Sequence, residues 1–153
     1  MRDNTRVLNA RETNAILDVL KAQWGYHRKL PFALLQSNAD RLYGITLDFA
    51  RVDPKTINID AAGLYFGELR HGELRLSIEG SQLIGPYAQT NIVELSPAQM
   101  RQWLKGEDIP WTGTEKGFVL LRCGTDFLGS GKYKVDEGMI LNFVPKARRI
   151  LTD

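Results

Sequence analysis

The sequence predicts an α+β fold, in which a small unit of one helix and a few strands precedes a partly closed β-barrel with two short helices. An amphipathic segment with helix-capping residues at both ends opens the chain at about residues 10–23. Short strand-like segments separated by turn residues fill most of the remainder, which is typical of small barrels. With 43% hydrophobic and 25% charged residues, the chain has the composition of a domain able to bury a core.

The first unit is expected to combine a helix with a meander of strands. Asn9 can cap the helix, Glu12 stands where a capping box requires an acceptor, and Gly25 can close the C-terminal end. Apolar and polar residues then alternate in several short segments bounded by turn residues, which indicates strands with one buried face. These strands are expected at residues 32–36, 42–49 and 56–60.

A change in the residue pattern near residue 62 divides the sequence into two expected domains, residues 1–62 and 63–153. In the second, Ser77 can cap a short helix over residues 78–84, which Gly85 and Pro86 end. Ser96, Pro97 and Gln99 are a strong start for another helix, which ends at Gly106. The expected strands of this domain are residues 64–69, 91–95, 118–123, 127–135 and 140–144.

Bulk properties point to the cytoplasm. The single cysteine, Cys123, excludes an internal disulfide and fits a reducing compartment. Charges interrupt every apolar run, so no membrane span is expected, and the first six residues lack the apolar core of a secretory signal. The net charge of +2 does not by itself indicate nucleic acid, but residues 117–149 hold six Lys/Arg against three Asp/Glu.

Patterns for catalysis and cofactors are weak. Gly129-Ser-Gly-Lys132 lacks the earlier glycine and the final hydroxyl of a phosphate-binding loop, since Asp126 and Tyr133 occupy those positions. The glycines are better explained by a strand that bulges or passes close to another backbone. His27 and His71 are the only histidines and have no cysteine pair, so no metal and no other cofactor is expected.

Acidic pairs are the remaining route to an enzyme. Asp48 with Asp53, or Glu79 with Asp126, could work as acid and base, but globular proteins offer many such pairs. No nucleophile-elbow spacing surrounds Cys123 or the serines. We therefore expect no enzymatic activity and no catalytic residue.

Basic residues interleaved with aromatic residues and glycine are the pattern that remains. Arg122, Lys132 and Lys134 occupy strand positions, and the spacing of the two lysines places them on one face. Lys146, Arg148 and Arg149 follow the last strand. Lysine can neutralise phosphate, and arginine can also stack on bases, so this pattern favours RNA. A solvated strand face with a frayed tail would show the same composition.

The second domain resembles a PUA domain, the small pseudo-barrel named for RNA pseudouridine synthases and archaeosine transglycosylases. Residues 126–132 with 142–149 are similar to the C-terminal RNA-binding region of Sun-family rRNA cytosine methyltransferases and to stand-alone archaeal relatives of that region. The two-module layout also resembles ribosome-biogenesis proteins that pair an α+β unit with a PUA domain. Further segments that carry the resemblance are residues 63–67, 76–85 and 117–121.

The resemblance implies binding of rRNA or tRNA as an accessory to RNA modification or ribosome biogenesis. In PUA domains the first helix, its loop and a neighbouring strand commonly contact RNA, which on this chain implicates Ser77, Glu79 and Ser81 among others. Gly80 and Gly131 would let RNA approach the backbone closely. The expected RNA-binding residues are Arg75, Gly80, Gln82, Gly131, Lys132, Lys134, Lys146, Arg148 and Arg149. An alternative is a protein-interaction module that docks an RNA methyltransferase or an assembly factor.

Overall fold

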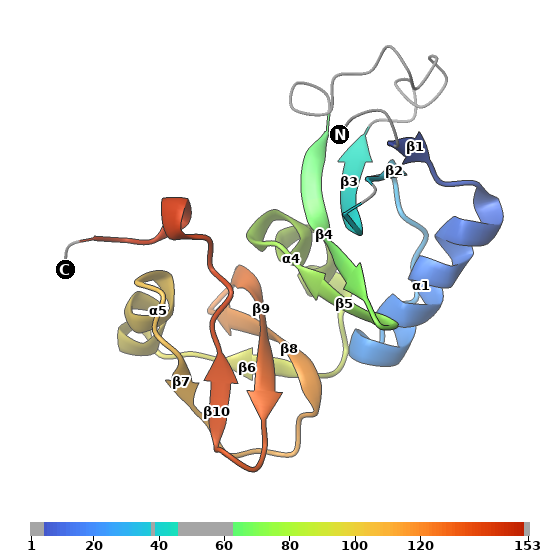
Figure 1. Ribbon diagram of the computed structural model, residues 1–153. Helices are drawn as coiled ribbons and strands as arrows, with labels where there is room; N and C mark the ends of the chain where they lie inside the picture. The colour runs from blue at the N-terminus through green and yellow to red at the C-terminus, as the bar shows by residue number, and fades with distance from the viewer. Residues whose placement is uncertain (1–4, 38, 46–62, 152–153) are drawn as a thin grey trace.

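The computed structural model describes residues 5–37, 39–45 and 63–151 and shows two sheets with helices at their faces (Figure 1). The first sheet is antiparallel, with strand order β1-β2-β3-β4-β5, and α1 covers it. Its elements are β1 (Arg6–Val7), α1 (Ala10–Trp24), β2 (Ala33–Gln36), β3 (Arg41–Ile45), β4 (Leu64–Arg70) and β5 (Glu73–Leu76).

The second sheet is a curled half-barrel with strand order β6-β8-β9-β10-β7. Strands β6 and β8 are parallel, and the other pairs are antiparallel. Its elements, with the helices around it, are α4 (Ile78–Ile84), η3 (Gly85–Tyr87), β6 (Ile92–Glu94), α5 (Pro97–Leu104), β7 (Ile109–Pro110), β8 (Gly117–Cys123), β9 (Asp126–Lys134), β10 (Met139–Leu141) and η4 (Lys146–Arg148). This architecture confirms the expected α+β class with a barrel-like second part.

The helix ends follow the predicted caps. The Asn9 side chain accepts a hydrogen bond from the Glu12 amide at 2.8 Å, and the Glu12 carboxylate accepts one from the Asn9 amide at 3.0 Å. Gly25 closes α1 in the left-handed region, with φ of 66°. Ser77 caps α4, and Ser96 forms a second capping box at α5. All three expected helices are confirmed within two residues at each end.

Three strands do not appear among the sequence-based expectations, namely β1, β5 and β7. Strands β4 and β5 belong to the first sheet, where β4 pairs with β3 through Tyr43 opposite Tyr65. Strand pairing therefore joins residues on both sides of the predicted domain boundary at residue 62. The boundary and the strand expected at 56–60 lie outside the described residues and stay predictions.

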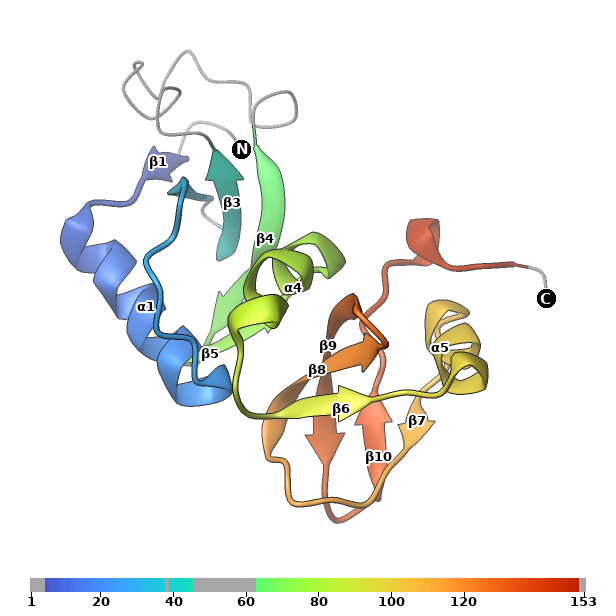
Figure 2. The same ribbon diagram turned by 180° about the vertical axis from the view of Figure 1, so that it is seen from behind.

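Helix α4 lies between the two sheets (Figure 2). Hydrogen bonds of two buried serines, Ser81 and Ser130, connect the elements around it. The Ser81 hydroxyl donates to the Ile78 carbonyl at 2.7 Å and accepts from the Gly129 amide on β9 at 2.8 Å. The Ser130 hydroxyl donates to the Leu76 carbonyl at 3.0 Å. Since both serines are almost fully buried, these bonds fix the distance between β5, α4 and β9.

The glycines of β9 shape the half-barrel. The register between β8 and β9 shifts at Leu120 and Arg122, and Gly129 adopts a φ of +96° there. The bulge that the Gly-Ser-Gly pattern predicts is therefore confirmed. None of the described helices is long and apolar enough to cross a membrane.

Candidate nucleic-acid interface

A cleft of about 110 Å³ lies where the end of β5 and the start of α4 face β9 and the segment after β10. It mixes aromatic rings, cations and one carboxylate. The polar, charged and aromatic side chains that line it include Tyr65, Arg75, Ser77, Glu79, Phe143 and Arg148. A shallower depression continues from Arg75 to Phe118 and Lys132 on the strand faces. We call these two connected surfaces the inter-sheet cleft.

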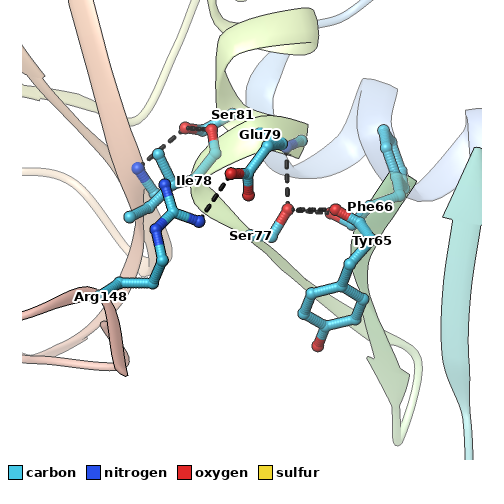
Figure 3. Close-up of polar contacts among 9 residues, drawn as sticks. Tyr65, Phe66, Ser77, Ile78, Glu79, Ser81 and Arg148 are labelled. Atoms are coloured by element: carbon cyan, nitrogen blue, oxygen red, sulfur yellow. Dashed lines mark hydrogen bonds and ion pairs between the residues drawn. The ribbon is translucent and has the colours of Figure 1, made fainter. Parts of the chain in front are cut away.

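Ser77 fixes the start of α4 at the edge of the inter-sheet cleft (Figure 3). Its hydroxyl donates to the Tyr65 carbonyl at 2.6 Å and accepts from the Gly80 amide at 2.9 Å. Gly80 is buried, and a Cβ there would lie 2.1 Å from the Phe66 carbonyl oxygen. A close backbone approach at Gly80 is thus made within the protein, by the Phe66 carbonyl. The expected contact of Gly80 with RNA stays a prediction.

Glu79 points from α4 toward Arg148 on η4, as Figure 3 shows, and the two form an ion pair at 2.6 Å. Side-chain exposure is 47% for Arg148 and 29% for Glu79. An ion pair this exposed contributes between zero and about 1 kcal/mol, because water and salt screen it. A phosphate can therefore replace the carboxylate at Arg148 at modest cost.

Two cations lie over aromatic rings in the inter-sheet cleft. The Arg75 guanidinium is 4.5 Å from the Phe143 ring centroid, and the Lys132 ammonium is 4.9 Å from the Phe118 centroid. The centroids of the two phenylalanine rings are 6.1 Å apart. Cations and aromatic faces thus form one continuous surface across β5, β8, β9 and the segment after β10.

Carboxylates accompany these cations. Arg75 pairs with Glu68 at 2.8 Å, and Lys132 pairs with Glu73 at 3.2 Å. Together with Arg148 and Glu79, three of the predicted cations have glutamate partners, so the surface is less positive than the sequence pattern suggests. All three cationic side chains nevertheless keep 30–47% of their surface exposed.

Tyr65 supplies a neutral phenol at the rim of the inter-sheet cleft. Burial raises the pKa of its hydroxyl, partly offset by the positive charge of Arg75. The group therefore stays protonated at neutral pH and can donate a hydrogen bond. Its ring centroid lies 5.7 Å from that of Tyr43 on the neighbouring strand.

The other predicted residues are spread more widely. Lys134 ends β9 beyond the inter-sheet cleft, Lys146 is exposed on η4, and Gln82 is exposed on α4. Arg149 has a structural contact, because its Nε donates to the Val144 carbonyl at 3.0 Å.

Gly131 is closely packed within the protein, as Gly80 is. It is buried, and a Cβ there would come within 2.7 Å of Trp103, Ile140 and the Leu141 carbonyl. The glycine is needed for close packing inside the protein. The expected approach of RNA to this backbone stays a prediction.

Sequence reasoning missed the aromatic half of this surface. Phe118 and Lys132 are directly opposite residues of β8 and β9, and Phe143 follows β10. The cross-strand register could have revealed the first pair, since opposite residues lie on one face of a sheet. Nothing local marks Phe143 as a partner of Arg75, which is 68 positions earlier in the chain.

Metal and acid–base chemistry gain no support from the described geometry. No group of three or more His, Cys, Asp or Glu side chains able to hold a metal is found among the described residues. Asp48 and Asp53 lie outside the described residues. Glu79 binds Arg148, and the Ser77 hydroxyl donates to a backbone carbonyl, so neither is poised against a base.

Comparison with known proteins identifies one domain type. Residues 90–150 match the family model of the methyltransferase RsmF PUA domain. The match spans β6 to η4 and confirms the similarity expected from residues 126–132 and 142–149. No curated protein shows significant sequence similarity to the chain. The PUA domain is an RNA-binding module, so the match supports RNA binding in general.

Proposed function

We propose that the chain binds structured rRNA or tRNA through the inter-sheet cleft and acts, without catalysis, as an accessory to RNA modification or ribosome biogenesis. One observation supports this most strongly, namely two cations that lie over the half-buried rings of Phe118 and Phe143, both of which belong to the region that matches a PUA domain. The same proposal places the chain in the cytoplasm, where Cys123 would stay reduced.

The chemistry of the inter-sheet cleft suits unpaired nucleotides beside a duplex. Phe118 and Phe143 offer faces on which bases can stack, and Arg75 and Lys132 can reach the adjoining phosphates. Arg148 adds a third cation at the other end of the inter-sheet cleft. Each cation would exchange a glutamate for a phosphate on binding, so affinity should fall steeply with salt.

Titration of a labelled tRNA transcript and an rRNA stem-loop tests this function. A triple variant with Arg75→Gln, Lys132→Gln and Arg148→Gln removes the three cations that line the surface. The matched control carries Arg6→Gln, Arg11→Gln and Lys21→Gln, which neutralise three exposed cations on the first unit.

The cleft variant should lower the slope of log affinity against log salt by about 2 to 3, as expected for three phosphate contacts. The control variant should retain the wild-type slope. Equal affinities for the two variants and the wild-type protein would refute the site. Absence of binding by the wild-type protein at low salt would refute the function.

A protein-docking role is the second candidate, and the glutamate partners of Arg75, Lys132 and Arg148 favour it. A surface of balanced charge suits a protein partner such as an RNA methyltransferase or an assembly factor. Pull-down from nuclease-treated extract separates the two roles. A partner that remains after nuclease treatment and is lost in the cleft variant would support docking.

A further inference from the structure

A second basic surface lies at the C-terminal end of α1. The Trp24 carbonyl accepts hydrogen bonds from the Gln89 and Thr90 amides at 2.8 and 3.2 Å, and the Asn91 side chain donates to the Gln23 carbonyl at 2.7 Å. These bonds hold the loop after α1 against the segment that follows η3, and Figure 2 shows the two side by side.

Tyr26 anchors this loop in the hydrophobic core. Its side chain is only 4% exposed, and its hydroxyl donates to the Lys29 carbonyl at 3.3 Å. The three residues that follow Tyr26, namely His27, Arg28 and Lys29, are exposed. A loop anchored in this way loses less conformational entropy when a ligand binds than an unanchored loop does.

Arg28 lies over an exposed aromatic ring. Its guanidinium carbon is 4.0 Å from the centroid of Tyr87, which is 46% exposed at the end of η3. A guanidinium in this position is held by the ring and still has N–H groups free to fork onto a phosphate.

The charge balance of this surface differs from that of the inter-sheet cleft. Residues 25–30 and 85–91 contain Arg28 and Lys29 and no Asp or Glu. Neither cation takes part in an ion pair with another described residue. Uncompensated positive charge beside an aromatic ring is the chemistry of a site for a phosphodiester strand.

We infer that His27, Arg28, Lys29 and Tyr87 form a second RNA contact, in which the cations bind consecutive phosphates and Tyr87 stacks on a base. The inference rests on the proposed function, because the same RNA would contact both surfaces. The inter-sheet cleft and the second surface lie toward opposite ends of α4, whose seven residues span about 10 Å. The second contact would make the first unit part of the RNA interface.

Three variants test the second contact with two probes, a tRNA transcript and a 12-nucleotide single-stranded RNA. Arg28→Ala with Lys29→Ala removes both charges, Tyr87→Ala removes the ring, and Arg28→Lys keeps the charge without the planar group. Arg11→Ala, an exposed cation at the other end of α1, is the control. Thermal denaturation of each variant verifies that it folds.

The double variant should lower the salt slope by about 1.4 to 1.8, as expected for two phosphates. Tyr87→Ala should weaken binding about fivefold or more at an unchanged slope. Arg28→Lys should keep the slope and lose affinity, and Arg11→Ala should match the wild-type protein.

If the double variant and Tyr87→Ala both keep the affinity and the salt slope of the wild-type protein, the second contact is overturned and the inter-sheet cleft is unaffected. A protein-docking role of this surface would produce that result. If the wild-type protein binds neither probe, the proposed function fails, and the second contact fails with it.

Discussion

Glu79→Gln should tighten RNA binding, because the Glu79 carboxylate neutralises a cation that the proposed interface uses. The ion pair to Arg148 spans 2.6 Å, and both side chains are partly exposed. Glutamine has nearly the same shape and keeps a hydrogen-bond acceptor toward Arg148. The substitution therefore removes a negative charge and leaves the surface otherwise unchanged.

The expected gain follows from two contributions. Freeing Arg148 from an exposed ion pair saves between zero and about 1 kcal/mol on binding. Removing a unit negative charge about 7 Å from a phosphate in water saves about 0.6 kcal/mol more. The sum corresponds to roughly 3- to 15-fold tighter binding at low salt, which should fade as screening increases.

Fluorescence anisotropy with the tRNA transcript at 50 and 200 mM salt measures this change. Glu12→Gln is the matched control, because Glu12 forms an equally short exposed pair with Arg6 at the start of α1. Glutamine also serves in a capping box, so the control helix keeps its cap.

Weaker binding by Glu79→Gln would contradict the reasoning and indicate that the carboxylate itself contacts the RNA, for example at a base edge. Unchanged binding would show that Arg148 contributes no phosphate contact. A gain of the same size in Glu12→Gln would show that the tighter binding arises from the change in net charge alone.

Two further predictions concern the scaffold and its response to acid. Gly80→Ala should lower the free energy of unfolding by about 1–3 kcal/mol, because its Cβ would meet the Phe66 carbonyl. Thermal denaturation should show a melting temperature lower by about 2–12 °C. Gln82→Ala, on the exposed side of α4, is the control, and an unchanged melting temperature of Gly80→Ala would contradict the close approach. Hydrogen bonds from Arg122 and from the Gly124 amide lower the pKa of Glu94, so its stabilising effect should be present above the ordinary glutamate pKa and disappear as pH falls through the lower folded-state value. The free energies of unfolding of the wild-type protein and Glu94→Gln, measured in urea, should converge as pH falls from neutral to below the ordinary glutamate pKa, and a difference independent of pH would contradict the assignment.

The helices could be predicted because their ends depend on neighbouring residues. Asn9 with Glu12, and Ser96 with Gln99, satisfy amides within one turn, so the capping boxes are readable in the sequence and present in the structure. Strand β5 escaped prediction although Glu73–Leu76 alternates charged and apolar residues, because four residues are the shortest run in which this strand pattern can be recognised. Its hairpin turns through His71 and Gly72, which both have a positive φ.

The candidate site was only half visible for a related reason. Arg75, Lys132 and Arg148 stand out as cations in the sequence and line the inter-sheet cleft. The glutamates that pair with Lys132 and Arg148 are 59 and 69 positions away, so the charge balance depends on the tertiary fold. Gly80 and Gly131 could be recognised as positions of close backbone approach, but a glycine pattern does not show that the approaching groups belong to the protein itself.

Nuclear magnetic resonance titration of the 17.3 kDa chain with the tRNA transcript tests the central claim most directly. The account predicts that backbone amides around Arg75–Glu79, Leu128–Lys132 and Asn142–Arg148 shift together and saturate at one RNA concentration. Saturable shifts confined to residues outside both proposed surfaces, or no shifts at low salt, would contradict it.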